Sequence, residues 1–148
     1  MPTTLHHQTT PFDSRSSIAI AVYLTLIGYG VQVAMPVISS ARMTWLGFDA
    51  VEVGRIAGAD LGGLALGALL AALGLRRGNW RILVVSGVLL VLAANLLCMR
   101  YPFFYPTLWL RGVAGIGAGL CAAVGVASLG ACSRPSHAYN IMLFAFAF

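Results

Sequence analysis

The chain has 148 residues, of which 59% are hydrophobic and only 9% are charged, and its mean hydropathy is +0.89. A soluble domain carries about 25% charged residues, so this chain could not cover a globular surface with polar groups. Bilayer hydrocarbon removes that requirement, and we expect an integral membrane protein. The net charge of +5 does not indicate a nucleic-acid binder, because the arginines cluster at the ends of apolar runs, where loop charge governs topology.

The first sixteen residues are polar, rich in Thr and Ser and interrupted by proline, and we expect a disordered cytoplasmic tail over 1–16. Residues 17–38 come next and carry no charge. As a helix they would measure about 33 Å, enough to cross a hydrocarbon core of about 30 Å and too long for the apolar region of a signal peptide. Residues 39–52 form a polar break that contains Arg42, Asp49 and Glu52. The sequence therefore predicts a first membrane span that ends before this break.

Three further long apolar runs come after the break, separated by short turns that are basic or aromatic. Counted from the N-terminus, the second run contains Arg55 and Asp60, the third has no charge and the fourth contains Arg111. A fifth run is only about half as long as a span. The predicted spans after the first are 53–75, 82–99, 107–132 and, incomplete, 138–148.

Arginine placement predicts how these spans are oriented. With the N-terminus in the cytoplasm, the cytoplasmic side would hold five arginines in its tail and loops, and the other side would hold Arg42 and Arg100. This distribution obeys the positive-inside rule. We expect a multi-pass protein of the bacterial inner (cell) membrane with a cytoplasmic N-terminus.

The fifth run predicts that the sequence is a fragment of a longer protein. About ten apolar residues reach only about 15 Å into a bilayer. A chain that ended there would leave carbonyl groups unsatisfied in lipid, at several kcal/mol for each group.

Two charges inside the predicted spans are candidate functional residues. A lone arginine costs about 2.5–3.5 kcal/mol on insertion scales, so Arg111 needs a polar cavity or a partner. Asp60 lies at a similar depth below the same edge, which permits an ion pair. Asp60 could also carry a coupling proton. The alternative is that the side chains of Arg111 and Arg55 extend to the outer interface, so that their charged groups lie outside the apolar core.

The glycines of the second and fourth spans favour close helix packing. A dinucleotide-binding loop is excluded, because no strand precedes Gly115 and no acidic residue comes after it. Small residues spaced four apart instead let two helices approach closely. The predicted packing glycines are Gly58, Gly62, Gly63, Gly67, Gly115, Gly117 and Gly119.

The segment 110–119, an arginine and then a ladder of glycines, resembles the fourth-helix motif of the major facilitator superfamily of transporters. Residues 54–70, within the second span, resemble that family's second helix. The turn after it resembles the family's basic loop, although Leu75 stands where the family has Asp and Asn79 where it has Arg. The resemblance covers about residues 17–148 and implies an all-α polytopic transmembrane helix bundle, the partial N-terminal six-helix half of a 12-helix carrier.

The resemblance also implies roles for individual residues. The family's first and fourth helices line the substrate cavity, so Tyr29, Gln32 and Arg111 are the substrate-cavity candidates. Gln32 is an amide near mid-membrane depth, and glycine and proline interruptions accompany binding sites of this kind. The alternative is that Tyr29 packs and Gln32 hydrogen-bonds a neighbouring helix. The family's gating loop would correspond to Arg76, Arg77, Gly78 and Arg81.

The first functional hypothesis is a secondary carrier that moves a small solute by alternating access, driven by a proton or solute gradient and needing no cofactor. The fragment would not transport without the missing C-terminal half of the same protein. The alternative is a small helical membrane scaffold or regulatory subunit, in which the glycines serve only association. An enzyme is disfavoured, because the sequence has no nucleophile–base set, no paired carboxylates and no metal-ligand cluster.

Overall fold

A computed structural model describes residues 13–75 and 79–147, and in these ranges the chain forms helices and no strand. The predicted all-helical class is confirmed. The five helices are α1 (Arg15–Leu46), α2 (Ala50–Gly74), α3 (Trp80–Arg100), α4 (Phe104–Gly130) and α5 (Pro135–Ala147).

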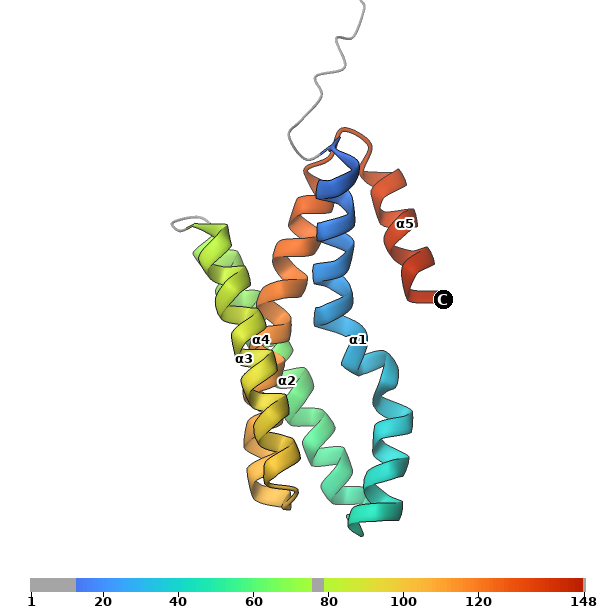
Figure 1. The fold of residues 1–148 in the computed structure, drawn as a ribbon, viewed down its shortest axis with the longest axis vertical. Coiled ribbons are helices and arrows are strands. Elements are labelled where there is room, and N and C mark those ends of the chain that lie inside the picture. Colours follow the sequence, from blue (N-terminus) through green and yellow to red (C-terminus); the bar gives the residue numbers. More distant parts are fainter. Residues whose placement is uncertain (1–12, 76–78, 148) are drawn as a thin grey trace, which may run out of the picture.

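Helices α1 to α4 run alternately up and down in one elongated bundle (Figure 1). The starts of α1 and α3 and the ends of α2 and α4 lie toward one end, which we call the tail end. The α1–α2 and α3–α4 turns lie at the other, which we call the far end. Helix α4 is the centre of the bundle, since it contacts each of the other helices and α2 most extensively.

Helices α1 to α4 are each long and apolar enough to cross a membrane. Helix α3 shows this most clearly, because Leu89, Leu92 and Leu96 remain 55–66% exposed on its outer side. Aromatic side chains collect at the far end, where Trp45, Phe103 and Tyr105 are largely exposed, as in the aromatic belt of a membrane interface. These features are compatible with an integral membrane protein.

Helix α1 extends beyond the predicted first span. The sequence predicted a polar break over 39–52, whereas α1 continues through Pro36 to Leu46 and ends at Gly47, whose φ of 67° is left-handed. Proline removes one backbone hydrogen bond and bends a helix without necessarily ending it. The true break covers only Gly47 to Asp49, and Asp49 then begins α2 in a capping box with Glu52.

A change of direction divides α1 into two parts (Figure 1). Its buried residues all lie between Ala21 and Gly28, and there a Cβ on Gly28 would stand 2.6 Å from the Cβ of Ala122 on α4. Beyond this contact α1 presents no buried residue to the described chain. Pro36 explains the bend, because the carbonyl one turn before a proline loses its helical donor.

The predicted tail over 1–16 is partly ordered. Ser14 caps α1, which begins at Arg15. The carboxylate of Asp13 accepts hydrogen bonds of 2.8 Å from both the backbone N–H and the hydroxyl of Ser133. These bonds tie the start of α1 to the α4–α5 turn. Residues 1–12 of the predicted tail lie outside the described residues.

Candidate functional site

Polar side chains from four different helices converge in the far half of the bundle. Gln32 and Arg42 come from α1, Asp60 from α2, Asn95 from α3 and Arg111 from α4. We call these five residues the polar cluster. At 1.5 Å per residue, Arg111 lies roughly 10 Å and Asp60 roughly 15 Å along its helix from the far end.

Asp60 is the carboxylate at the centre of this cluster, and it is only 3% exposed. Its Oδ2 accepts a hydrogen bond of 3.0 Å from the Nε2 of Gln32. Its Oδ1 lies 3.9 Å from the Nη1 of Arg111. A buried carboxylate requires such partners, because removing one partner of a buried ion pair destabilises a protein by about 3–5 kcal/mol.

Arg111 connects Asp60 to α3. It is 5% exposed, and its Nη2 donates a hydrogen bond to the Oδ1 of Asn95. The amide nitrogen of Asn95 donates in turn to the backbone carbonyl of Val91 at 2.8 Å, which fixes the amide so that its oxygen faces the guanidinium. Among the described residues the Nε of Arg111 has no acceptor.

Arg42 adds a second positive charge to the cluster. It is half-buried, and the charges of Arg111 and Asp60 are near enough to act on its guanidinium group. Its buried Nη1 also finds no acceptor in the described chain. An unsatisfied buried donor costs about 1–3 kcal/mol, and more when it is charged. The cluster therefore places two guanidinium groups against one carboxylate and leaves a donor on each unused.

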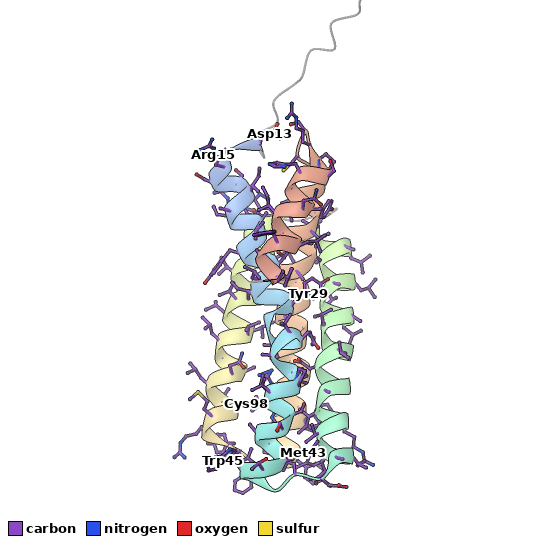
Figure 2. All side chains as sticks on the ribbon, turned by 90° about the vertical axis from the view of Figure 1, so that its right-hand side faces the viewer. Asp13, Arg15, Tyr29, Met43, Trp45 and Cys98 are labelled. Carbon is purple, nitrogen blue, oxygen red and sulfur yellow. The ribbon has the colours of Figure 1, made fainter. Side chains whose placement is uncertain are left out.

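The structure brings three of the predicted site residues together and leaves Tyr29 apart. Gln32, Asp60 and Arg111 join the cluster, whereas the ring of Tyr29 packs edge-on against Phe146 of α5 with centroids 6.0 Å apart. Tyr29 also lies nearer to the tail end than Cys98 does (Figure 2). The contacts of Tyr29 thus match the packing alternative, and Gln32 makes a hydrogen bond to a neighbouring helix.

Arg81 is the described residue of the predicted gating loop. It is exposed in the first turn of α3, and its guanidinium carbon lies 5.6 Å from the centroid of the Trp80 ring. Arg76, Arg77 and Gly78 lie outside the described residues.

Five of the predicted packing glycines lie where two helix backbones meet. A Cβ on Gly63 or Gly67 would overlap a carbonyl oxygen of α4, and a Cβ on Gly115 would overlap the carbonyl oxygen of Asp60. Gly119 approaches α2 and Gly117 approaches α3 in the same way. This close contact between α2 and α4 positions Asp60 beside Arg111.

Gly58 and Gly62 differ from the other predicted packing glycines. Both are exposed, and a Cβ on either would meet nothing within 4 Å in the described chain. Their spacing predicted close packing, but neither makes a close contact with α4. The face of α2 that carries them is therefore uncovered.

Two members of the polar cluster were not predicted, Arg42 and Asn95. Arg42 was assigned to the polar break because α1 was expected to end near Pro36. Asn95 was included in a span described only as uncharged, although a lone amide in an apolar span is the same signal that identified Gln32.

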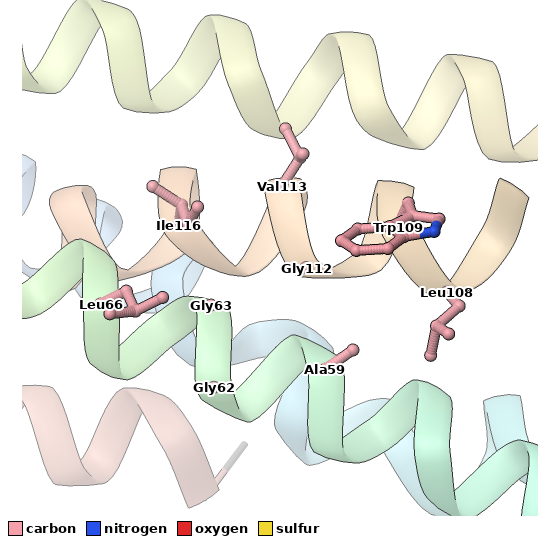
Figure 3. Close-up of a pocket in the computed structure, with 9 residues that line it drawn as sticks. All are labelled: Ala59, Gly62, Gly63, Leu66, Leu108, Trp109, Gly112, Val113 and Ile116. Atoms are coloured by element: carbon pink, nitrogen blue, oxygen red, sulfur yellow. The ribbon is translucent and has the colours of Figure 1, made fainter. Parts of the chain in front are cut away.

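An apolar groove of about 520 Å³ lies beside the cluster, between α2 and α4. Figure 3 shows Ala59, Gly62 and Gly112 on its floor, with Leu66 and Trp109 at its margins. Its lining contains no charged side chain. The groove therefore offers nothing to orient a polar solute, and the polar cluster is the stronger candidate site.

No family model, no curated protein and no solved structure matches this chain. The likeness to the major facilitator superfamily rests on the motifs of the second and fourth spans. The polar cluster and the shape of α1 are therefore the features from which a function is inferred.

Proposed function

We propose that this chain is part of a secondary carrier that moves a small solute across a membrane by alternating access. In this proposal α1 to α5 belong to the N-terminal six-helix half of a 12-helix carrier of the major facilitator type. The missing C-terminal half would form the other wall of the cavity, and a proton or solute gradient would drive transport.

The buried polar cluster is the observation that carries this proposal. Charged side chains inside membrane spans are rare, and they mark substrate or ion pathways. A bundle held together only by packing gains nothing from placing Asp60 and Arg111 at this depth, because its glycine contacts suffice. Carriers, in contrast, bind solutes at polar positions near the membrane midplane, on helices that bend.

The shape of α1 supports the same proposal. Its first part packs on α4 near Gly28, while beyond the bend no residue of α1 is fully buried and Gln32 donates a hydrogen bond to Asp60 of α2. A helix anchored at one end and joined by polar contacts at the other can move without disrupting an apolar core. Asp60, held by Gln32 from one side and Arg111 from the other, could then exchange partners or a proton as α1 moves.

A scaffold or regulatory subunit is the second candidate function. The uncovered face of α2 at Gly58 and Gly62 favours it, because small residues spaced four apart let another helix approach closely. A scaffold needs that face and does not need the cluster's charges.

A transport assay of the complete gene product, including any sequence beyond codon 148, separates the two functions. The purified protein is reconstituted in vesicles that contain a pH-sensitive dye, and panels of small solutes are added. The carrier proposal predicts solute-dependent proton or solute flux that Asp60→Asn abolishes and Arg134→Gln, in the exposed α4–α5 turn, preserves. Flux that is unchanged in Asp60→Asn would contradict the proposed role of the cluster, and absence of any flux would favour the scaffold.

The orientation proposed with this function has its own test. Single cysteines at positions 79 and 44 are introduced into a variant that lacks the three native cysteines, and a membrane-impermeant maleimide is applied to intact cells. We expect labelling at position 44 from outside and at position 79 only after the cells are opened. The reverse pattern would place the N-terminus outside.

A further inference from the structure

We propose that the polar cluster binds a small oxyanion, such as a carboxylate, between Arg42 and Arg111. The binding site stands on the structure by itself. The assignment of this anion as the transported solute rests on the carrier function proposed above.

The charges of the cluster do not balance. Arg42 and Arg111 contribute two positive charges and Asp60 contributes one negative charge, so one positive charge is left uncompensated. An uncompensated charge in an apolar interior is strongly unfavourable, and such charges are normally paired. Arg111 is almost fully buried and Arg42 is half-buried near the far end, so one further negative charge would stabilise the cluster.

No other acidic side chain of the sequence supplies this charge. The chain has four acidic residues. Asp13 binds Ser133 at the tail end, and Asp49 and Glu52 form the capping box of α2. The compensating negative charge thus comes from a group other than a side chain of these 148 residues.

Two unused donors indicate where that group would bind. The Nε of Arg111 and the Nη1 of Arg42 are buried and lack acceptors among the described residues. Arg111 is only 5% exposed, so bulk water does not satisfy it. A carboxylate has two oxygens that accept charge-assisted hydrogen bonds from guanidinium groups, and it would supply the acceptors that these donors lack.

The same charge count predicts selectivity. One negative charge brings the cluster to neutrality, whereas a dianion would leave it negative, with Asp60 adding repulsion. A neutral sugar would satisfy donors but would leave the surplus charge. We therefore expect a monoanion to bind more tightly than a dianion, and an uncharged polyol not to bind.

The test uses the purified protein in a nonionic detergent, with thermal unfolding as the readout at constant ionic strength. The probes are acetate and lactate, with inorganic phosphate at pH 8 as the dianion, glucose as the neutral solute and chloride as the reference salt. Binding to the folded state raises the unfolding temperature as the ligand concentration rises. We expect acetate and lactate to raise it beyond chloride, and glucose to have no effect.

Variants show whether the anion binds at the cluster. Arg42→Gln removes one donor and the surplus charge from a half-buried position near the far end of α1, where folding is less at risk than in Arg111→Gln. We expect it to weaken acetate binding roughly 10- to 100-fold, the range for hydrogen bonds to charged groups. Arg134→Gln removes the same charge from an exposed position and should leave binding unchanged. Equal acetate shifts in wild type and Arg42→Gln would overturn the proposal, and so would the absence of a shift with every oxyanion.

Two further measurements separate the sources of the anion. In nanodiscs, loss of the acetate shift when anionic phosphatidylglycerol replaces zwitterionic phosphatidylcholine would identify an anionic lipid headgroup as the ligand and overturn the assignment to a solute. In vesicles of the complete gene product, anion binding without anion flux would overturn the carrier function and leave the site intact. Flux of neutral solutes alone would support the carrier and overturn the anion as its substrate.

Discussion

Helix α4 holds its neighbours by two different means in two different regions. Against α2 it uses glycines, so that the backbones of Gly115 and Asp60 touch directly. Against α3 in the far half it uses a hydrogen bond from Arg111 to Asn95, and the same Arg111 lies 3.9 Å from Asp60 of α2. The glycine contact is complete within the described chain, whereas the polar contact has unused donors. The tight backbone contact and the polar cluster therefore adjoin along α4, since Arg111 and Gly115 lie one turn apart on the same side of the helix.

The difference predicts that the two regions respond differently to substitution. Close backbone contact tolerates no added volume, because overpacking displaces whole helices. Polar contacts tolerate the exchange of one charge for its opposite, because a neighbouring amide can donate a hydrogen bond to an anion or accept one from a cation. Substitutions in the glycine contact should therefore affect folding, and those in the cluster should affect binding at a smaller cost in stability.

The largest expected effect is that of Gly63→Leu. The new side chain would overlap the backbone of α4 at Gly112 and would force α2 and α4 apart. Overpacking costs about 1–3 kcal/mol where side chains can adjust and more where backbones must separate, as here, so we expect loss of monodisperse protein in size-exclusion chromatography. Gly62→Leu, one position along the same helix, is the matched control, since a Cβ at Gly62 would meet nothing within 4 Å. Equal loss in both variants would show that Gly62 is also covered by a helix.

Charge reversal tests the ion pair and is expected to rank second. Asp60→Arg or Arg111→Asp alone should destabilise the protein by about 3–5 kcal/mol, since each leaves like charges buried together. The double variant should recover part of this loss, because Gln32 and Asn95 can turn their amides to the exchanged charges. Thermal unfolding of the three variants in detergent measures the recovery. A double variant no more stable than the worse single variant would refute the pairing.

The helices, and Asp60 and Arg111 as partners, could be predicted from the sequence. Apolar runs, and isolated charges within them, are visible in the local composition. Apolar runs of span length have one stable conformation in lipid, and two opposite charges at similar depth have few alternatives to each other. The course of α1 beyond Pro36 was not predictable in this way. Whether a proline ends or bends a helix depends on the residues after it, here the left-handed cap at Gly47.

The error at α1 also hid part of the candidate site. Arg42 lies in the cluster only because α1 continues for about two turns beyond its predicted end at residue 38. Residue propensities do not determine where a helix ends to this precision. The difference between Gly62 and Gly63 was equally hidden. Adjacent glycines lie about 100° apart around a helix, and only the position of α4 determines which of them is covered.

Asn95→Leu is expected to have a smaller effect than breaking the ion pair. It removes the acceptor of Arg111 and leaves a charged donor unsatisfied, which costs about 1.5–3 kcal/mol. Asn140→Leu on the exposed side of α5 makes the same chemical change away from the cluster and should leave the unfolding temperature nearly unchanged. If Asn95→Leu were equally harmless, the bond between α3 and Arg111 would be absent in the membrane.

The smallest expected effect is that of Gln32→Leu. The hydrogen bond from Gln32 to Asp60 crosses the limited contact between α1 and α2, and such bonds in membranes contribute about 0.6–1.7 kcal/mol. Asp60 keeps Arg111, so the carboxylate is not left alone. Val33→Leu, one residue along on the exposed side of α1, is the control in the same unfolding assay.

A loss well above about 2 kcal/mol in Gln32→Leu, beyond the range for such bonds, would mean that Gln32 is what holds the far part of α1 in place. Helix α1 could not then move as the carrier proposal requires. A small loss, with solute flux reduced in the complete protein, would place Gln32 among the groups that serve transport and not folding.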